Sequence, residues 1–102
     1  MMPQNQSAIE MITRQIDEVN TIFKQTMQDL NTVRGHERVT SWKKRTVEML
    51  AQHLGQKEAQ RFASTAPGPS FTNDLAEELG DEIEVYRTFL QTLARQLEQA
   101  KS

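Results

Sequence analysis

Residues 76–100 read AEELGDEIEVYRTFLQTLARQLEQA, and this stretch decides the fold class. Its apolar positions are separated by alternating steps of three and four residues, which is the spacing of one face of an α-helix. These positions are Ala76, Leu79, Ile83, Tyr86, Leu90, Leu93, Leu97 and Ala100. Asp74 and Glu77 form an N-cap pair, so the sequence predicts a helix over residues 73–100. Gly80 costs about 1 kcal/mol relative to alanine, but the apolar phase continues across it.

The N-terminal third of the chain has the same spacing. Its inner positions are Ile9, Ile12, Ile16, Val19, Phe23, Thr26, Leu30 and Val33, of which only Thr26 is polar. Ser7 and Glu10 form a capping box, and Gly35 follows the last apolar position, where helices often end. We therefore expect a helix over residues 7–34 and disorder over residues 1–6.

The middle of the chain predicts one helix over residues 37–54 and a short one over residues 56–63. The first has Val39, Trp42, Thr46, Met49 and His53 as inner candidates, with Gly55 just beyond its end. The sequence Pro67-Gly68-Pro69 cannot continue a helix, because proline lacks the amide donor and clashes with the preceding turn. We expect a loop there, with Phe71 pinning it to the rest of the protein.

Helices that are apolar on one side are marginal alone in water and must bury these faces against one another. No alternating strand pattern is present, so the predicted fold class is all-α. The simplest arrangement is one domain, residues 1–102, folded as an antiparallel three-helix bundle with a short extra helix before the Pro-Gly-Pro loop. A dimer is the alternative packing, in which the longer first and last helices pair with a second copy.

Composition excludes several function classes. The chain has 102 residues and no cysteine, which removes disulfides, thiolate metal sites and cysteine nucleophiles. No apolar run reaches the roughly 18 residues that a membrane span needs, and no secretory signal is recognisable, so we expect a cytoplasmic protein with no membrane contact. The net charge of −2 gives no general bias toward nucleic acid.

The residues that carry most chemistry do not form a recognisable catalytic or metal-binding motif. His36 and His53 lack the spacing and the companion ligands of a zinc site. No phosphate-binding glycine loop is present, and neither Ser41 nor Ser70 has a histidine and an acid at recognisable offsets. The carboxylates near the start of the last helix suit a solvated helix start, with an acidic partner-binding surface as the alternative. We expect no enzymatic activity, no cofactor, no metal and no small-molecule substrate.

A basic cluster stands out between residues 34 and 45. Residues 35–66 carry a net charge of +3, whereas residues 67–102 carry −4. Basic groups near a helix start oppose the helix dipole, which hints at a role. Three interpretations stay open: pairing with the acidic start of the last helix, contact with phosphate or nucleic acid, and contact with a protein. The apolar phase turns Trp42 inward, but a half-exposed Trp42 would make a docking point. The candidate partner-binding residues are Arg34, Arg38, Trp42, Lys43, Lys44, Arg45 and Phe71.

A pattern over residues 35–100 resembles a known class of protein. Its elements are Trp42-Lys43-Lys44-Arg45, Leu50, Leu54-Gly55, Glu58-Ala59-x-Arg61-Phe62, a loop, and then Tyr86, Leu90 and Leu93. It is similar to the small helical N-terminal modules of multidomain bacterial phage-defence proteins, in which a TIR-like or other effector domain follows. The resemblance implies a sensing, adaptor or oligomerisation module, with any enzymatic activity on another domain or chain.

The sequence therefore predicts a non-enzymatic protein–protein interaction or oligomerisation module, acting as an adaptor or sensor in bacterial defence. Its expected partner is another protein or a second copy of the chain, as in a homodimer. The alternative is a small nucleic-acid-associated regulator that binds through the basic start of the second long helix, although we expect nucleic acid less than protein because aromatic side chains for base stacking are scarce there.

Overall fold

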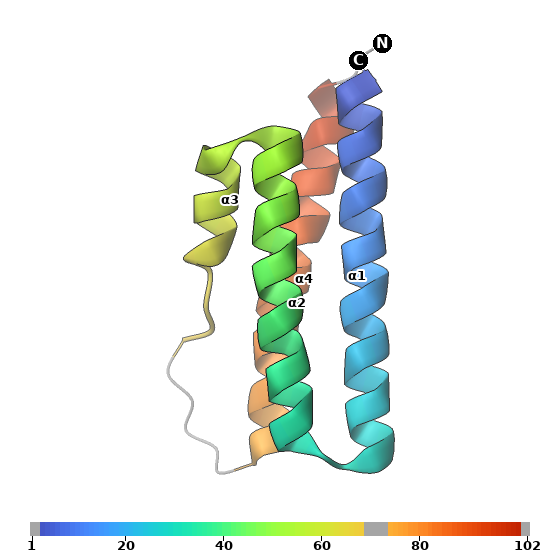
Figure 1. Cartoon of the computed structure of the whole chain (residues 1–102), viewed down its shortest axis with the longest axis vertical. Helices are drawn as coiled ribbons and strands as arrows, with labels where there is room; N and C mark the ends of the chain where they lie inside the picture. The colour runs from blue at the N-terminus through green and yellow to red at the C-terminus, as the bar shows by residue number, and fades with distance from the viewer. Residues whose placement is uncertain (1–2, 69–73, 101–102) are drawn as a thin grey trace.

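The computed structural model of the chain describes residues 3–68 and 74–100, and nearly all of them are helical (Figure 1). The helices are α1 (Pro3–Asp29), α2 (Thr32–Leu54), α3 (Gln56–Ala63) and α4 (Leu75–Ala100). No strand occurs within these two ranges. The prediction of an all-α fold is confirmed.

The three long helices lie side by side along the long axis of the molecule, which measures 47 Å (Figure 1). The α1 helix packs against both α2 and α4, whereas α2 and α4 touch each other much less. The short α3 helix turns back along α2 and covers only the C-terminal half of it (Figure 1). This unequal packing leaves the N-terminal halves of α2 and α4 without a helix between them, and the candidate site lies there.

The core lies where the predicted apolar faces meet. Its largest fully buried side chains include Trp42, Phe62, Ile12, Leu50, Ile83 and Leu90. Phe62 of α3 packs against Trp42, Tyr86 and Phe89, with ring centroids 5.4–6.0 Å apart. The Trp42 indole N–H donates to the Gln15 carbonyl at 3.0 Å. The inward placement of Trp42 and of the middle of the α4 ladder is therefore confirmed, and Phe62 anchors α3 to this core.

The first long helix ends at Asp29 and not at residue 34, which corrects the sequence prediction. The Asp29 carboxylate accepts the Asn31 N–H at 3.0 Å, and the Asn31 side chain accepts the Arg34 N–H at 3.0 Å as the N-cap of α2. These bonds satisfy backbone donors that a continuous helix would bond internally. Leu30, between them, adopts a φ of 55°. Leu30 and Val33, predicted to face inward, are 78% and 65% exposed.

Gly35 does not end a helix, as the sequence suggested, but lies buried inside α2. A Cβ atom at this position would stand 2.5 Å from Thr26 Oγ1 and 3.1 Å from Leu79 Cδ2. Gly35 therefore permits the close approach of α2 to α1 and α4. Thr26 is fully buried and donates its hydroxyl to the Ile22 carbonyl at 2.8 Å, which explains how a polar residue fits the α1 ladder.

The other helix bounds show smaller differences. The α1 helix begins at Pro3, so residues 3–6 are not disordered as predicted; proline is favoured at a first helical position because no amide donor is needed there. The α2 helix begins five residues earlier than predicted, because Asn31 caps it, whereas the bounds predicted for α3 are confirmed. The α4 helix begins at Leu75, after Asp74, whose carboxylate accepts the Ala76 N–H at 2.9 Å. Phe71 lies outside the described residues.

Candidate partner-binding groove

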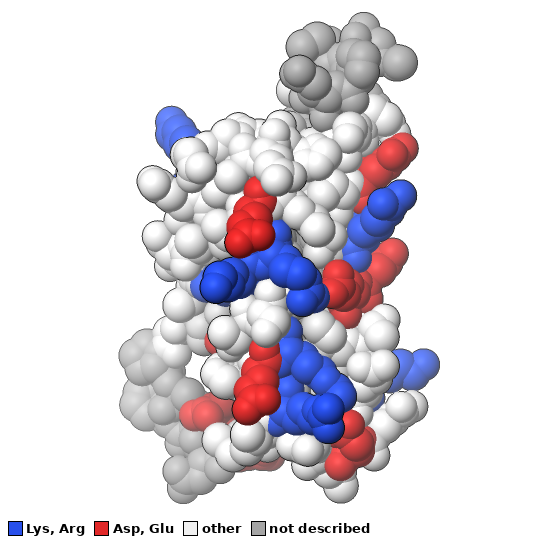
Figure 2. All heavy atoms as spheres, in the orientation of Figure 1, with Lys and Arg blue, Asp and Glu red and all other residues white. Residues whose placement is uncertain are grey.

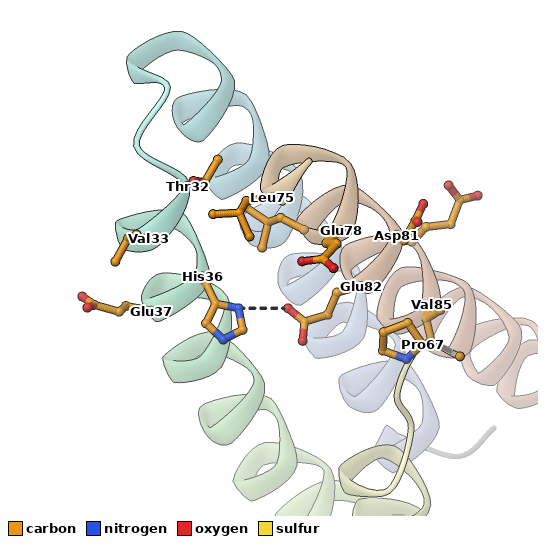
Figure 3. Close-up of a pocket in the computed structure, with 13 residues that line it drawn as sticks. Thr32, Val33, His36, Glu37, Pro67, Leu75, Glu78, Asp81, Glu82 and Val85 are labelled. Carbon is orange, nitrogen blue, oxygen red and sulfur yellow. Dashed lines mark ion pairs between the residues drawn. The ribbon is translucent and has the colours of Figure 1, made fainter. Parts of the chain in front are cut away.

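An open groove of about 830 Å³ runs between the N-terminal halves of α2 and α4 (Figure 3). Thr32, Val33, His36 and Glu37 of α2 line one side, and residues of α4 between Leu75 and Val85 line the other. Pro67 and Gly68, which follow α3, close it on the side toward that helix. We call this feature the α2–α4 groove. It exists because α3 is only eight residues long and fills only part of the space beside α2.

The groove has apolar residues on both sides. Val33 comes from α2, and Leu75, Leu79 and Val85 come from α4. Leu79 is buried, whereas Val33 and Leu75 keep 65% and 57% of their surfaces exposed. These two belong to the three large apolar side chains that stand out to solvent among the described residues, the third being Leu30 at the same end of the molecule. Exposed apolar groups gathered at one place mark sites of contact with other molecules.

The charge of the groove is strongly negative. Its acidic lining residues are Glu37, Glu78, Asp81, Glu82 and Glu84. None of the described residues that line it is a lysine or an arginine, and His36 is its sole histidine. Clefts lined by charges of one sign concentrate ligands of the opposite sign. The groove therefore combines apolar contact surface with attraction for positive charge.

A chain of polar contacts connects the groove to the core. His36 Nδ1 lies 3.5 Å from Glu82 Oε1, and Figure 3 shows the two side chains pointing toward each other from α2 and α4. The Tyr86 hydroxyl donates to Glu82 Oε2 at 3.0 Å. The Lys43 ammonium donates to that hydroxyl at 3.4 Å and to the Thr65 carbonyl at 2.8 Å. These contacts join α2, α4 and the segment after α3, so they fix the shape of the inner end of the groove.

Burial shifts the pKa values of two members of this chain. Burial raises the pKa of Tyr86, and the negative charge of Glu82 and its hydrogen bond raise it further. Burial lowers the pKa of Lys43, and the attraction of Glu82 opposes that change. The Lys43 ammonium also lies 4.4 Å from the centroid of the Tyr86 ring, a cation–π distance. The Tyr86 hydroxyl thus stays protonated and holds Glu82 in place.

The predicted basic cluster does not form one free surface. Arg45 pairs with Glu18, and Arg38 lies 3.9 Å from Asp29. The Lys43 ammonium donates to the Thr65 carbonyl and the Tyr86 hydroxyl. The carboxylate partners of the two arginines belong to α1, not to the start of the last helix as one interpretation held. Since α2 begins at Thr32, Lys43, Lys44 and Arg45 lie in the middle of the helix and not at its start. The face in Figure 2 shows blue and red groups interleaved.

Of the remaining candidates, Trp42 departs from the docking interpretation, and Phe71 stays a prediction. Trp42 is fully buried, so it is a core residue and not an exposed docking point. Phe71 lies outside the described residues. Arg34 and Lys44 are exposed and have no ion pair within 4 Å in the described part of the chain. The structure thus keeps two of the seven candidates as exposed, unpaired side chains, and neither lines the groove.

The histidines take separate places. His36 lines the groove, whereas His53 is exposed in the last turn of α2, the favourable end for positive charge. In the ranges that the structure describes, no three His, Asp or Glu side chains are placed to hold a metal ion. Within the same ranges, no helix has an apolar stretch long enough to cross a bilayer.

Sequence reasoning missed the groove because two of its apolar residues lie off the ladders and a third, Val33, was assigned to the wrong helix. Leu75 and Val85 lie outside the regular α4 positions, and apolar residues off the ladder were the available signal. Val33 was placed inside by a helix prediction that ran too far. The acidic start of the last helix was recognised as an alternative partner surface, and four of its residues do line the groove.

Comparison of the chain with models of known protein families, with curated proteins and with solved structures gave no match.

Proposed function

We propose that the chain is a non-enzymatic module that binds another protein through the α2–α4 groove. In this proposal the molecule is an antiparallel three-helix bundle of α1, α2 and α4, with α3 as a short extra helix before the Pro67–Pro69 connection. The observation that carries the proposal is the exposure of Val33 and Leu75 inside an open, acidic groove. Covering each of them would contribute about 1–2 kcal/mol to binding.

The carboxylates of the groove and its apolar residues have different roles in binding. The carboxylates of the groove attract and orient a partner, which mainly raises the association rate. Val33, Leu75 and the buried Leu79 then provide apolar contact, which slows dissociation. The polar chain from His36 to Lys43 keeps the groove in shape before binding, so less order has to be gained on association.

The resemblance to the helical modules of bacterial defence proteins favours an adaptor or sensing role in the bacterial cytoplasm. The competing function is nucleic-acid binding through the exposed Arg34 and Lys44. Acidic side chains lie among the basic ones on that face, and phosphate would be repelled there (Figure 2). We therefore favour a protein partner.

A site-specific crosslinking experiment tests the proposal. A photoreactive amino acid is placed at Val33 in the groove, or at Lys44 in the basic cluster, in cells of the native host. We expect a protein to crosslink from position 33 and not from position 44. The purified crosslinked protein should then bind the unmodified chain, and Val33→Ser should weaken that binding by about tenfold.

The matched control is Leu30→Ser, which changes an apolar residue that is even more exposed than Val33, at the same end of the molecule but outside the groove. It should change the binding less than about twofold. Protein crosslinked only from position 44 would contradict the groove as the docking site. Nucleic acid crosslinked from position 44 would favour the competing function.

A further inference from the structure

We propose that the partner of the α2–α4 groove presents a short amphipathic helix with an apolar stripe between flanking lysine and arginine residues. This inference rests on the proposed function and adds the chemistry of the partner. It follows from two observations: the way α3 fills the other half of the same space, and the charge of the lining residues.

The first observation concerns shape. The α3 helix packs beside α2 and inserts Phe62 against Tyr86 and Phe89 of α4. It ends at Ala63, and the groove continues the same space along the N-terminal halves of α2 and α4. Its α4 side runs from Leu75 to Val85, about 15 Å at 1.5 Å per residue. A partner helix of two to three turns fits this length.

A helix in such a groove inserts side chains at positions i, i+3 or i+4, and i+7. Three apolar side chains at this spacing extend about 10 Å along the helix axis. They would lie against Leu75, Leu79 and Val85, which line the α4 side of the groove. Val33, which belongs to the α2 side of the groove, would contact the incoming stripe at its edge.

The second observation concerns charge. Five carboxylates line the groove and no lysine or arginine does so among its described lining residues. Glu37, Glu78 and Asp81 have no ion pair within 4 Å among the described residues. An acidic partner would meet like charges on both sides, whereas lysine and arginine can lay their aliphatic stems on apolar surface and point their charges at the carboxylates.

A second copy of this chain fits less well as the occupant. Three of its cluster side chains, Arg38, Lys43 and Arg45, already have partners within their own molecule, which leaves only Arg34 and Lys44 of that cluster for the groove of another copy. Its exposed apolar residues at this end, Leu30, Val33 and Leu75, lie next to the same acidic groove. Two grooves facing each other would bring like charges together, which disfavours a symmetric dimer through this face.

Two synthetic helical peptides of about 14 residues test the inference. Both carry leucines at i, i+3, i+7 and i+10; one has lysine and arginine at the flanking positions and the other has glutamate. Fluorescence anisotropy measures their dissociation constants, and NMR of the Val33, Leu75, Leu79 and Val85 methyl groups locates the binding. We expect the basic peptide to bind at least tenfold more tightly and to shift these methyl signals, with the preference shrinking in about 1 M salt.

Matched charge variants show whether the groove carboxylates cause this preference. The groove variant is Glu78→Gln, Asp81→Asn, Glu84→Gln, which keeps side-chain shape and leaves Glu82 to its internal contacts. The control variant is Asp17→Asn, Glu48→Gln, Glu98→Gln, which changes net charge equally outside the groove. We expect about tenfold weaker binding of the basic peptide to the groove variant and less than a twofold change for the control. Circular dichroism checks that both remain helical.

The outcomes separate this inference from the proposed function. Equal binding of both peptides at the groove methyls, or equal weakening by both charge variants, overturns the basic partner but leaves a groove-binding module. If neither peptide shifts these methyl signals but a protein crosslinks from position 33, the helical partner alone is overturned. Failure of the peptides together with absence of crosslinking from position 33 overturns both. Sedimentation could instead show self-association that grows with concentration. If the groove methyl signals shift with that self-association, a second copy is the occupant and the inference is overturned.

Discussion

Replacing Gly35 with alanine should destabilise the protein, although alanine is the better helix former. The added Cβ would stand 2.5 Å from Thr26 Oγ1 and 2.6 Å from Thr26 Cγ2. The favourable separation of two non-bonded heavy atoms is about 3.5 Å or more, so the two helices would have to part by about 1 Å. Thr26 cannot easily turn away, because it is fully buried and its hydroxyl is bonded to the Ile22 carbonyl.

Two opposing effects set the magnitude. Overpacking of this kind costs about 2–3 kcal/mol at a tight contact. The change from glycine to alanine in a helix interior returns about 1 kcal/mol. The free energy of unfolding should therefore fall by about 1–2 kcal/mol. In the Thr26→Ala background the two closest atoms are gone and only the flexible end of Leu79 stays close, at 3.1 Å, so Gly35→Ala should there be neutral or stabilise the protein by up to about 1 kcal/mol.

Urea denaturation followed by circular dichroism measures these free energies. The matched control is Gly80→Ala in α4, where a Cβ would meet the Phe23 ring at 3.5 Å, an ordinary contact. It should raise the free energy of unfolding by about 0.5–1 kcal/mol. If Gly35→Ala stabilises the protein as much as Gly80→Ala does, the close approach of α1 and α2 at Gly35 is refuted.

Three other predictions follow from local geometry. Leu30→Gly should stabilise the protein by up to about 1 kcal/mol in urea denaturation, because Leu30 is exposed and has a φ of 55°; a loss of stability would contradict this. Asn31→Ala should lower the free energy of unfolding by about 1 kcal/mol in the same assay, because the N-cap of α2 is lost. Asn31→Asp should keep most of that stability, because aspartate also caps helices. Because the pKa of Tyr86 is raised in the folded protein, the folded state holds the phenol proton more tightly than the unfolded state does. The free energy of unfolding should therefore be unaffected by Tyr86 below the ordinary pKa of 10.0 and should fall as the pH rises above it. Glu82→Gln should lower the pKa of the Tyr86 phenol, measured by its near-ultraviolet absorbance, but leave it above 10.0 because burial is the larger cause; an unchanged value would show that Glu82 has no influence.

Much of the fold could be predicted because the burial pattern is periodic. The ladder from Leu79 to Leu93 identified α4, and Trp42 was placed in the core from its phase. The turn between α1 and α2 was misplaced because Leu30 and Val33 continue the same period beyond the true end of the helix. Periodicity reports which positions can face inward, but a turn depends on local hydrogen bonds such as those of Asp29 and Asn31.

The candidate site was predictable only in part. The acidic residues of α4 were visible in the sequence as a possible surface, and Glu78 and Asp81 do line the groove. The basic cluster was the favoured candidate, but Arg45 and Lys43 found partners within the molecule. Charge counted along a sequence does not reveal which groups pair across helices, because the partners lie at separations such as the 27 residues between Glu18 and Arg45.

The sequence by itself determined that this protein is helical and which faces of α1 and α4 are buried over most of their lengths, because burying one apolar face removes side chains spaced at three and four residues from water together. For α2 the predicted inner face was right only as far as Thr46, because Leu50 is buried where Met49 and His53 were expected. The tertiary structure alone decided how closely the helices approach at Gly35 and how far α3 covers α2. Those choices depend on the volumes of side chains from different helices that meet in space. They also decide that an apolar, acidic groove remains open between α2 and α4.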